Sequence, residues 1–445
     1  MPKEQETNRK NRLFWALNGK LTEQGIRERV RDFKEKDFGG FFLHARAGLK
    51  SAYLSEEWFA AIGYAVDEAE KCGLEAWLYD EDGWPSGFAG GRVNGKGEDY
   101  CQKSLTARNL PKDFSCEMKN AEIDDKNFLA GFSSGRPEKI PEGSRYACFG
   151  NLPYKRDDSG KSEFCFGYKV NPFYVDIFSP RVTDEFIAVT HEEYKRRFGD
   201  RFGKTIKGIF TDEPQYGEYC YSPYLEKAFE EKKGYDLLDF IYLLFGDGQA
   251  AEVFRQDYYD VVCSVYKENY IDKINEWCVK NNLLFTGHFP EEDGISTQYL
   301  KGGNAMLNYT GMDFPGIDYL GRRYASPVLL KQISSAKNQL GKKEIISESF
   351  GCCGWGTRAS DYLGIWGYES AHGINNACLH LSAYSIAGVR KRDYPAFFSA
   401  QNNWWDSIGY LNRAMNGMNE FSSRGESEND ALVISPVYGC YSEKA

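Results

Sequence analysis

The sequence has no excess of positive charge and no apolar run long enough to cross a membrane. Its 55 Lys and Arg stand against 65 Asp and Glu, which gives a formal net charge of -10. A nucleic-acid partner requires clustered Lys and Arg to neutralise phosphates, so this balance argues against one. No stretch reaches the roughly 18 consecutive apolar residues of a transmembrane helix, which argues against a membrane partner.

A secretory signal and a disulfide framework are also missing. Residues 1–10 are polar and charged, without the apolar core of a signal peptide, and are predicted to be disordered. The 12 Cys are scattered through predicted strands and helices rather than paired across short loops, a distribution typical of reduced thiols. The sequence therefore predicts a cytoplasmic protein, and it carries no signal for an oligomeric state.

Motifs for nucleotide or metal chemistry are absent. Residues 87–91 are glycine-rich but lack the Gly-x-Gly-x-x-Gly register of a phosphate-binding turn. The first predicted strand has no His-x-His, and the cysteines of residues 98–180 have no Cys-x-x-Cys spacing, so no metal ligand is predicted. A metal-dependent hydrolase is therefore a weak hypothesis.

Aromatic residues, in contrast, are abundant. The 30 Tyr, 30 Phe and 9 Trp make up 16% of the chain. Aromatic rings fill cores, and they also stack on the C–H faces of sugar rings, where Tyr and Trp add a polar group. Most of these residues are expected in the core, and the excess fits carbohydrate binding.

Strand and helix patterns alternate along the chain, as is typical of an α/β fold with a parallel sheet. Eight apolar runs that alternate with helical segments indicate a (β/α)8 TIM barrel over residues 11–425. The predicted strands are 13–17, 40–44, 74–79, 207–210, 283–287, 305–307, 344–347 and 378–381. The predicted helices are 22–36, 55–72, 182–198, a long region at 221–281, 326–340, 361–375 and 402–424.

Two segments depart from this alternation. Residues 98–180 contain short alternating runs separated by Gly, Pro, Asp and Ser, which predicts an all-β insertion after the third strand. Residues 429–445 begin with an apolar run at 430–436 that predicts the opening strand of a further C-terminal domain, or a tail. The runs of the insertion are 104–110, 128–132, 146–149 and 164–170.

The stretch Gly208–Pro214 brings two carboxylates to the end of a predicted strand. Residues 207–210 form a short apolar run typical of a buried strand, and Asp212 and Glu213 follow it. Pro214 cannot continue the ladder and favours an extended Glu213, which leaves this acid at the rim of the barrel. Active sites of (β/α)8 barrels lie at that rim.

Glu348 ends the seventh predicted strand as Glu213 ends the fourth, so the two side chains can converge across the mouth of the barrel. A single Glu at a strand end is more often a solvated or helix-capping acid. Two facing carboxylates, however, suit glycosidic bond cleavage, because one protonates the leaving oxygen and the other attacks the anomeric carbon or activates a water. Glu213 and Glu348 are therefore the predicted catalytic residues.

Further polar and aromatic residues lie at predicted strand ends and in the loops that follow them. Such residues bind sugar hydroxyls or cover a ring face, although a lone His is more often a hydrogen-bonded structural residue. The predicted substrate-binding residues are Asp212, His44, Arg46, Asp80, Asp82, Trp84, His288, Trp355 and His380.

The acids Asp80, Glu81 and Asp82 allow a second interpretation. Several hard oxygen ligands close together suit Ca2+, whereas the acids of an ordinary turn cap the following helix. The loop lacks the Asp-x-Asp-x-Asp-Gly spacing of an EF-hand, so no cofactor is predicted, with Ca2+ as the alternative.

The run from His44 to Trp58, the loop Tyr79–Gly87 and the Asp-Glu-Pro of residues 212–214 resemble bacterial glycoside hydrolases akin to the α-L-rhamnosidase family numbered 106. The resemblance covers most of residues 10–425. It implies a (β/α)8 catalytic barrel with accessory β-domains, inverting hydrolysis by two Glu, and calcium assistance. It also implies that Glu213 is the general acid and Glu348 the general base.

Retaining barrel glycosidases of the wider clan place the acid/base after an Asn, and Asp212 stands there in this chain, which argues against a retaining mechanism. The sequence thus predicts a glycoside hydrolase that cleaves a terminal rhamnoside-like or other neutral sugar, with Glu348 as base or nucleophile. A non-catalytic carbohydrate-binding barrel, or an inactive fragment of a larger glycosidase, is the alternative.

Overall fold

The computed structural model describes residues 7–112, 114, 122–324, 326–425 and 427–443. Of the segment 1–10 that was predicted to be disordered, residues 1–6 lie outside the described residues. Asn8 is hydrogen-bonded to the barrel, because its backbone N–H donates to Glu75 Oε1 over 2.7 Å and its side chain donates to the Gly39 carbonyl over 3.0 Å.

Eight parallel strands close into a barrel in the order β1-β13-β12-β11-β10-β8-β3-β2, which confirms the predicted (β/α)8 TIM barrel. The first strand closes the cylinder by pairing with both β2 and β13. The strands are β1 (Arg12–Leu17), β2 (Gly40–Ala45), β3 (Glu75–Asp82), β8 (Ile206–Asp212), β10 (Leu284–His288), β11 (Phe314–Tyr319), β12 (Ile346–Ser349) and β13 (Asn376–Ala383).

Helices cover the outside of the barrel, and α1 and α2 have the expected capping residues. The Thr22 side chain accepts from the Gly25 N–H at the start of α1, and Gly73 ends α2 in the left-handed conformation. No described helix is both long and apolar enough to traverse a bilayer. The helices are α1 (Glu23–Glu35), α2 (Glu56–Cys72), α3 (Pro180–Val189), α4 (His191–Phe198), α5 (Pro223–Lys233), α6 (Gln249–Tyr266), α7 (Lys273–Lys280), α8 (Gln298–Lys301), α9 (Ala305–Tyr309), α10 (Pro327–Leu340), α11 (Ala359–Ala371), α12 (Ile408–Ser422) and α13 (Val437–Cys440).

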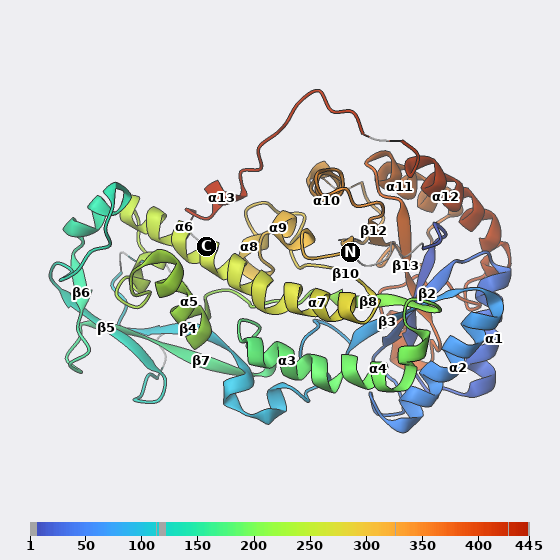
Figure 1. Ribbon diagram of the computed structural model, residues 1–445, viewed down its shortest axis with the longest axis horizontal. Coiled ribbons are helices and arrows are strands. Elements are labelled where there is room, and N and C mark those ends of the chain that lie inside the picture. The colour runs from blue at the N-terminus through green and yellow to red at the C-terminus, as the bar shows by residue number, and fades with distance from the viewer. Residues whose placement is uncertain (1–6, 113, 115–121, 325, 426, 444–445) are drawn as a thin grey trace.

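A second, antiparallel sheet has the strand order β6-β5-β7-β4-β9 and fits the predicted β insertion. It lies at the end of the molecule opposite α1 and α12 (Figure 1). Phe132 and Phe164 of this sheet pack against Tyr242, with ring centroids 4.9 and 6.3 Å away. Its strands are β4 (Cys101–Arg108), β5 (Phe128–Ser134), β6 (Tyr154–Arg156), β7 (Phe164–Val175) and β9 (Cys220–Tyr221).

The predicted sixth barrel strand is wrong. Residues 305–307 lie in helix α9, and the sixth strand is instead β11. Pro315 and Gly316 hide this strand in the sequence, because both residues are unfavourable in the interior of a central strand. A side chain at position 316 would also be excluded, since a Cβ there would lie 2.6 Å from the Gly287 carbonyl oxygen.

Other local predictions are wrong as well. Residues 146–149, predicted as an insertion strand, lie in the 3-10 helix η3 (Ser144–Asn151). The predicted helix 182–198 is two helices, α3 and α4, separated at Thr190. Residues 430–436 form no strand; they lead from α12 across the molecule to α13, which packs beside α6 (Figure 1).

An apolar layer fills the middle of the barrel. The rings of Phe14, Phe42 and Phe210 meet there, with the Phe210 centroid 5.3 Å from Phe14 and 5.1 Å from Phe42. Because the barrel is packed with side chains at this level, ligands are confined to its two ends. The layer comprises Phe14, Ala16, Phe42, Trp77, Tyr79, Phe210, Phe314, Ile346, Cys378, Leu381, Ala383 and Phe397.

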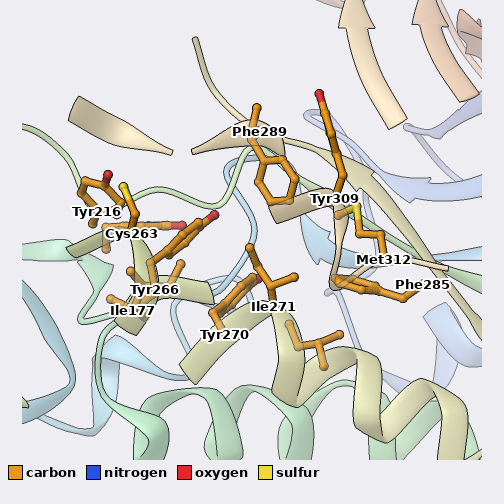
Figure 2. Packing of buried hydrophobic residues seen from close by; sticks show 14 of the residues in the cluster. Ile177, Tyr216, Cys263, Tyr266, Tyr270, Ile271, Phe285, Phe289, Tyr309 and Met312 are labelled. Atoms are coloured by element: carbon orange, nitrogen blue, oxygen red, sulfur yellow. The ribbon is translucent and has the colours of Figure 1, made fainter. Parts of the chain in front are cut away.

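Outside the barrel, a second apolar cluster joins the strands to the helix region that contains α6 and the π-helical turn η6 (Lys267–Asp272). Tyr266, Tyr270 and Ile271 extend from this region towards Phe285 and Phe289 (Figure 2). This packing fixes β10 and the segment that follows it.

A buried ion pair closes the lower end of the barrel. The Arg12 guanidinium is fully buried and donates to Glu75 Oε2 from Nη2 over 2.7 Å and from Nε over 3.1 Å. It also donates to Asn376 Oδ1 over 2.5 Å and lies 5.2 Å from the centroid of the Trp77 ring. Three strands are therefore joined through one side chain.

Replacing Arg12 with Met is expected to lower the free energy of unfolding by about 3–5 kcal/mol, because it leaves the Glu75 carboxylate buried without its cation. Urea unfolding followed by tryptophan fluorescence measures the change. Arg9→Met is the matched control, since Arg9 pairs with Glu420 at the exposed surface, and it should leave the midpoint unchanged. An equal effect of the two substitutions would contradict the interpretation.

Candidate active site

The mouth of the barrel carries a ring of polar side chains directly above the apolar layer. Residues two positions apart on a strand face the same side, so Asp212 follows Phe210 into the interior on β8, and Glu348 follows Ile346 on β12. The same alternation on the other strands completes a polar ring. Its members are His44, Tyr79, Asp212, His288, Asp318, Glu348 and His380.

His288 joins two carboxyl groups of the polar ring. Its Nε2 lies 2.9 Å from Glu348 Oε2 and 3.6 Å from Asp212 Oδ1. Burial lowers the pKa of the imidazole, but the Glu348 hydrogen bond and the charges of Asp212 and Glu348 outweigh it and raise the pKa of His288 well above its usual value. His288 is therefore an imidazolium that donates to Glu348.

The other two imidazoles of the ring are neutral. Burial, together with Arg46, holds the pKa of His44 well below its usual value, and burial lowers the pKa of His380 to about 4. His44 stacks on Tyr79 with centroids 3.7 Å apart, and neither of its ring nitrogens has a hydrogen-bond partner among the described residues. His380 Nε2 lies 3.8 Å from Glu348 Oε1.

Glu213 follows β8 with a backbone φ of 43°, so the predicted extended conformation is wrong. A left-handed conformation costs a non-glycine residue about 1–2 kcal/mol. Here the backbone is held on both sides, because the Glu213 N–H donates to the His288 carbonyl over 3.2 Å and Ser86 hydrogen-bonds both backbone groups of Asp212. The turn fixes the position of the Glu213 carboxyl.

The carboxyls of Glu213 and Glu348 have opposite pKa shifts. Burial and the negative Glu348 and Glu291 raise the pKa of Glu213. Burial acts in the same direction on Glu348, but the hydrogen bond from His288 and the nearby positive charges outweigh it and lower the pKa of Glu348. One acid is thus favoured in its protonated form and the other as a carboxylate.

Asp212 is buried between these groups. Burial raises its pKa to about 7, and His288 opposes the shift. The Tyr79 hydroxyl lies 2.6 Å from Asp212 Oδ2 and 2.6 Å from the Gly83 carbonyl oxygen. Asp212 therefore supports His288 and the loop after β3 in addition to facing the mouth.

The acids of residues 80–82 have three different roles. Asp80 is buried and accepts from the Ser86 hydroxyl over 2.5 Å, so this predicted substrate ligand holds its own loop. Glu81 is buried and accepts from five backbone N–H groups over 2.6–3.1 Å; these belong to Asp82, Gly87, Phe88, Ala89 and Gly90. Asp82 alone is exposed.

Neither group of acids fits a calcium ion, which takes about six to eight oxygen ligands. The Glu81 oxygens already accept from backbone N–H groups, and Asp80 Oδ1 accepts from Ser86, which leaves only Oδ2 of these two buried acids without a partner. At the mouth, one atom each of Asp212, His288 and Glu348 lie within 4.8 Å of one another. One of these atoms is an imidazole nitrogen that already donates to a carboxylate, so an oxygen cage is not formed by these residues.

Arg46 and Trp84 lie together at the rim beside β2. The Arg46 guanidinium donates to Asp393 Oδ2 and Oδ1 over 2.9 and 2.8 Å, and it lies 4.7 Å from the centroid of the Trp84 ring. Tyr394 meets the same indole edge-on at 5.8 Å. The Trp84 ring, 41% exposed, is thus fixed in orientation and accessible.

Trp355 follows β12 and is 46% exposed, with its ring edge-on to Phe397 at a centroid distance of 5.4 Å. Phe397 belongs to the apolar layer, so the indole is supported from below and open above. Its exposed face is suited to covering a sugar ring.

Two members of the polar ring were missed by the sequence interpretation. Tyr79 is the last residue of the predicted third strand 74–79, and it was given no role in the site. Asp318 lies on the sixth strand, in register with Glu348, and its Oδ1 is buried without a partner. The sequence would have indicated Asp318 as a residue of the mouth only if β11 had been recognised as a strand.

Comparisons with known proteins agree with this geometry. A model of glycoside hydrolase family 106, described as alpha-L-rhamnosidase, matches residues 168–416. The solved rhamnosidase from Novosphingobium sp. PP1Y has 14% identical residues and superposes with a TM-score of 0.67 over 95% of this chain and 60% of that one. A curated protein of Formosa agariphila, provisionally named a beta-glucuronidase, is 23% identical over 89% of this chain and 39% of its own length.

The chain thus spans less than two thirds of either relative. The structural match concerns the fold, whereas the family match extends over more than half of the 445 residues. It includes Glu213 and Glu348 and the strands that carry them. The chain belongs to glycoside hydrolase family 106, the alpha-L-rhamnosidase family.

Proposed function

We propose that this chain hydrolyses the glycosidic bond of a terminal neutral sugar, such as a rhamnoside, with Glu213 as general acid and Glu348 as general base. The observation that carries the proposal is the pair of opposite pKa shifts at the barrel mouth. Carboxyl groups whose environments separate their pKa values are suited to acid and base roles in one reaction.

Glu213 protonates the leaving oxygen. Its carboxyl takes part in no hydrogen bond or ion pair formed among the described residues, so it is free to reach the glycosidic oxygen. Burial beside Glu348 and Glu291 keeps the proton on Glu213 at pH values where an exposed Glu has lost it.

Glu348 remains ionised through its hydrogen bond to His288 and takes a proton from the attacking water. Direct attack by this water inverts the anomeric configuration, in line with the resemblance and with Asp212 in place of the Asn of retaining enzymes. No step of this mechanism uses a metal ion.

His44, His380 and Asp212 line the mouth and supply hydroxyl contacts, with Arg46 and Trp84 at the rim. Trp355 covers one face of the sugar ring. The exposed Asp82 contacts more distant parts of the substrate, whereas Asp80 acts indirectly by holding the loop through Ser86.

The acid-rich ring favours a neutral sugar over a uronic acid. A sugar carboxylate would add a negative charge beside the ionised Glu348, and the Arg46 guanidinium is already paired with Asp393. Repulsion between like charges in a desolvated site costs several kcal/mol at short range, on the order expected from Coulomb's law at intermediate dielectric.

Hydrolysis of 4-nitrophenyl α-L-rhamnoside is therefore expected to exceed that of 4-nitrophenyl β-D-glucuronide in kcat/KM by about tenfold or more, since each 1.4 kcal/mol corresponds to a factor of ten. Release of nitrophenolate measures both rates. A preference for the glucuronide would contradict the neutral-sugar assignment.

Glu213→Gln and Glu348→Gln are expected to fold normally and to lose about 100-fold or more of kcat, the usual contribution of general acid–base catalysis. Glu213→Gln should lose least with 2,4-dinitrophenol as leaving group, because that group departs without protonation. Glu348→Gln should be equally slow with all leaving groups. Glu218→Gln is the control, because Glu218 is an exposed acid of the segment that follows Glu213 and should keep wild-type rates. Wild-type rates in both active-site variants would disprove the assignment.

The pH–rate profile is expected to be bell-shaped. Activity falls as pH rises through the raised pKa of Glu213 and as pH falls through the lowered pKa of Glu348. His288 lowers both values, so His288→Gln should move both limbs to higher pH. Initial rates across pH on wild type and variant measure this shift. An acidic limb that does not move would show that His288 does not set the ionisation of Glu348.

A further inference from the structure

Asp318 is a largely buried acid of the polar ring that the proposed mechanism does not use. Its Oδ1 is buried and has no hydrogen-bond partner among the described residues. A buried polar atom without a partner destabilises the fold by about 1–3 kcal/mol. Because this oxygen belongs to the mouth where the substrate would bind, a molecule from outside the protein can supply the missing donor. That donor is either a water or a sugar hydroxyl.

The position of Asp318 favours a water, rather than a sugar hydroxyl, as this donor. Asp318 and Glu348 are paired in register on neighbouring parallel strands, and both side chains face the mouth. Neighbouring strands lie about 4.8 Å apart, so one water can donate to both carboxyls. Asp318 also lies within the electrostatic reach of His288, Glu213 and Asp212.

Glu348 needs such a partner to orient the water. Its Oε2 accepts from His288 over 2.9 Å, and its Oε1 lies 3.8 Å from His380. A water held by Glu348 alone can rotate about that single hydrogen bond. When its second hydrogen is donated to Asp318, a lone pair of the water oxygen is fixed towards the anomeric carbon, which provides the orientation that accelerates attack.

We propose that Asp318 is a catalytic residue that binds the attacking water together with Glu348. The inference rests on the proposed function. In the step, the water oxygen bonds to the anomeric carbon while the bond from that carbon to the leaving oxygen breaks. The leaving oxygen takes the Glu213 proton, one water proton passes to Glu348, and the other remains on the new sugar hydroxyl, hydrogen-bonded to Asp318.

Asp318→Ala is the test, assayed with 4-nitrophenyl α-L-rhamnoside. The expected result is a fall in kcat of about 100-fold or more with KM within about threefold of wild type, because the residue acts on water and not on the sugar. Sodium azide should restore the rate and form a glycosyl azide, since azide attacks without losing a proton and fits the space that the substitution opens. Glu348→Ala should respond to azide in the same way.

Asp313→Ala is the matched control. Asp313 precedes β11 at the opposite end of the same strand, away from the mouth, and also has a buried carboxyl oxygen without a partner. It should keep the wild-type kcat and KM and show no response to azide. If Asp318→Ala does not fold, as judged by thermal unfolding, Asp318→Leu keeps a side chain of similar length, cannot accept a hydrogen bond from the water, and should show the same loss of kcat at unchanged KM.

Three outcomes would overturn the inference. Wild-type kcat in the Asp318 variants, with Glu348→Ala inactive, would refute the role of Asp318 and leave the proposed function intact. A slow variant with a raised KM and no azide response would assign Asp318 to a sugar hydroxyl instead. No turnover of any neutral glycoside by the wild-type chain would refute the proposed function and this inference together.

Discussion

The barrel mouth depends on the interaction between the imidazole of His288 and the several buried carboxyl groups around it. Asp212, Glu213, Asp318 and Glu348 lie close enough for each to alter the ionisation of the others. Taken out of water without a cation, such a group would hold protons on most of its members. The imidazolium of His288 lets one carboxylate stay ionised while its neighbours retain protons, which is the asymmetry that acid–base catalysis requires.

The rest of the structure keeps this group in place. The apolar layer supports the ring from below and excludes water from that side, while Arg12 closes the opposite end. The loop after β3 is held by Glu81, whose carboxyl gathers five backbone N–H groups, and by Ser86, which bonds Asp80 and the backbone of Asp212. A residue far from the reacting atoms thus fixes the strand end that precedes Glu213, so the geometry of the acid depends on two loops at once.

Apolar runs in the sequence were sufficient to predict the barrel and to place Glu213, His288 and Glu348 at strand ends, whereas His380, predicted to close its strand, lies inside β13. The strands that carry these residues are easily recognised in the sequence, because strands buried on both faces are continuously apolar. Asp318 could not be found this way, since Pro315 and Gly316 interrupt its strand and only the neighbouring strands establish it.

The direction in which side chains point was the other feature that could not be predicted from the sequence. Asp80 follows the same apolar run as Tyr79, yet it bonds Ser86 while Tyr79 reaches Asp212, because alternation sends neighbours to opposite faces. The left-handed backbone of Glu213 depends on contacts with His288 and Ser86 that no local pattern encodes. The third strand also runs on to Asp82, so its acids are part of the strand and not of the loop that was predicted.

Closure of the cylinder by β1 and β13 links Arg12 with Cys378 and Ala16 with Ala383, pairs separated by nearly the whole barrel sequence. Contacts so distant along the chain form late and slowly, since a large loop entropy must be overcome first. Until they form, the acids of the nascent mouth are hydrated and titrate as ordinary side chains. The opposite pKa shifts of Glu213 and Glu348 therefore depend on this last strand pairing, so a chain with an open barrel lacks the separation between its two carboxyl groups.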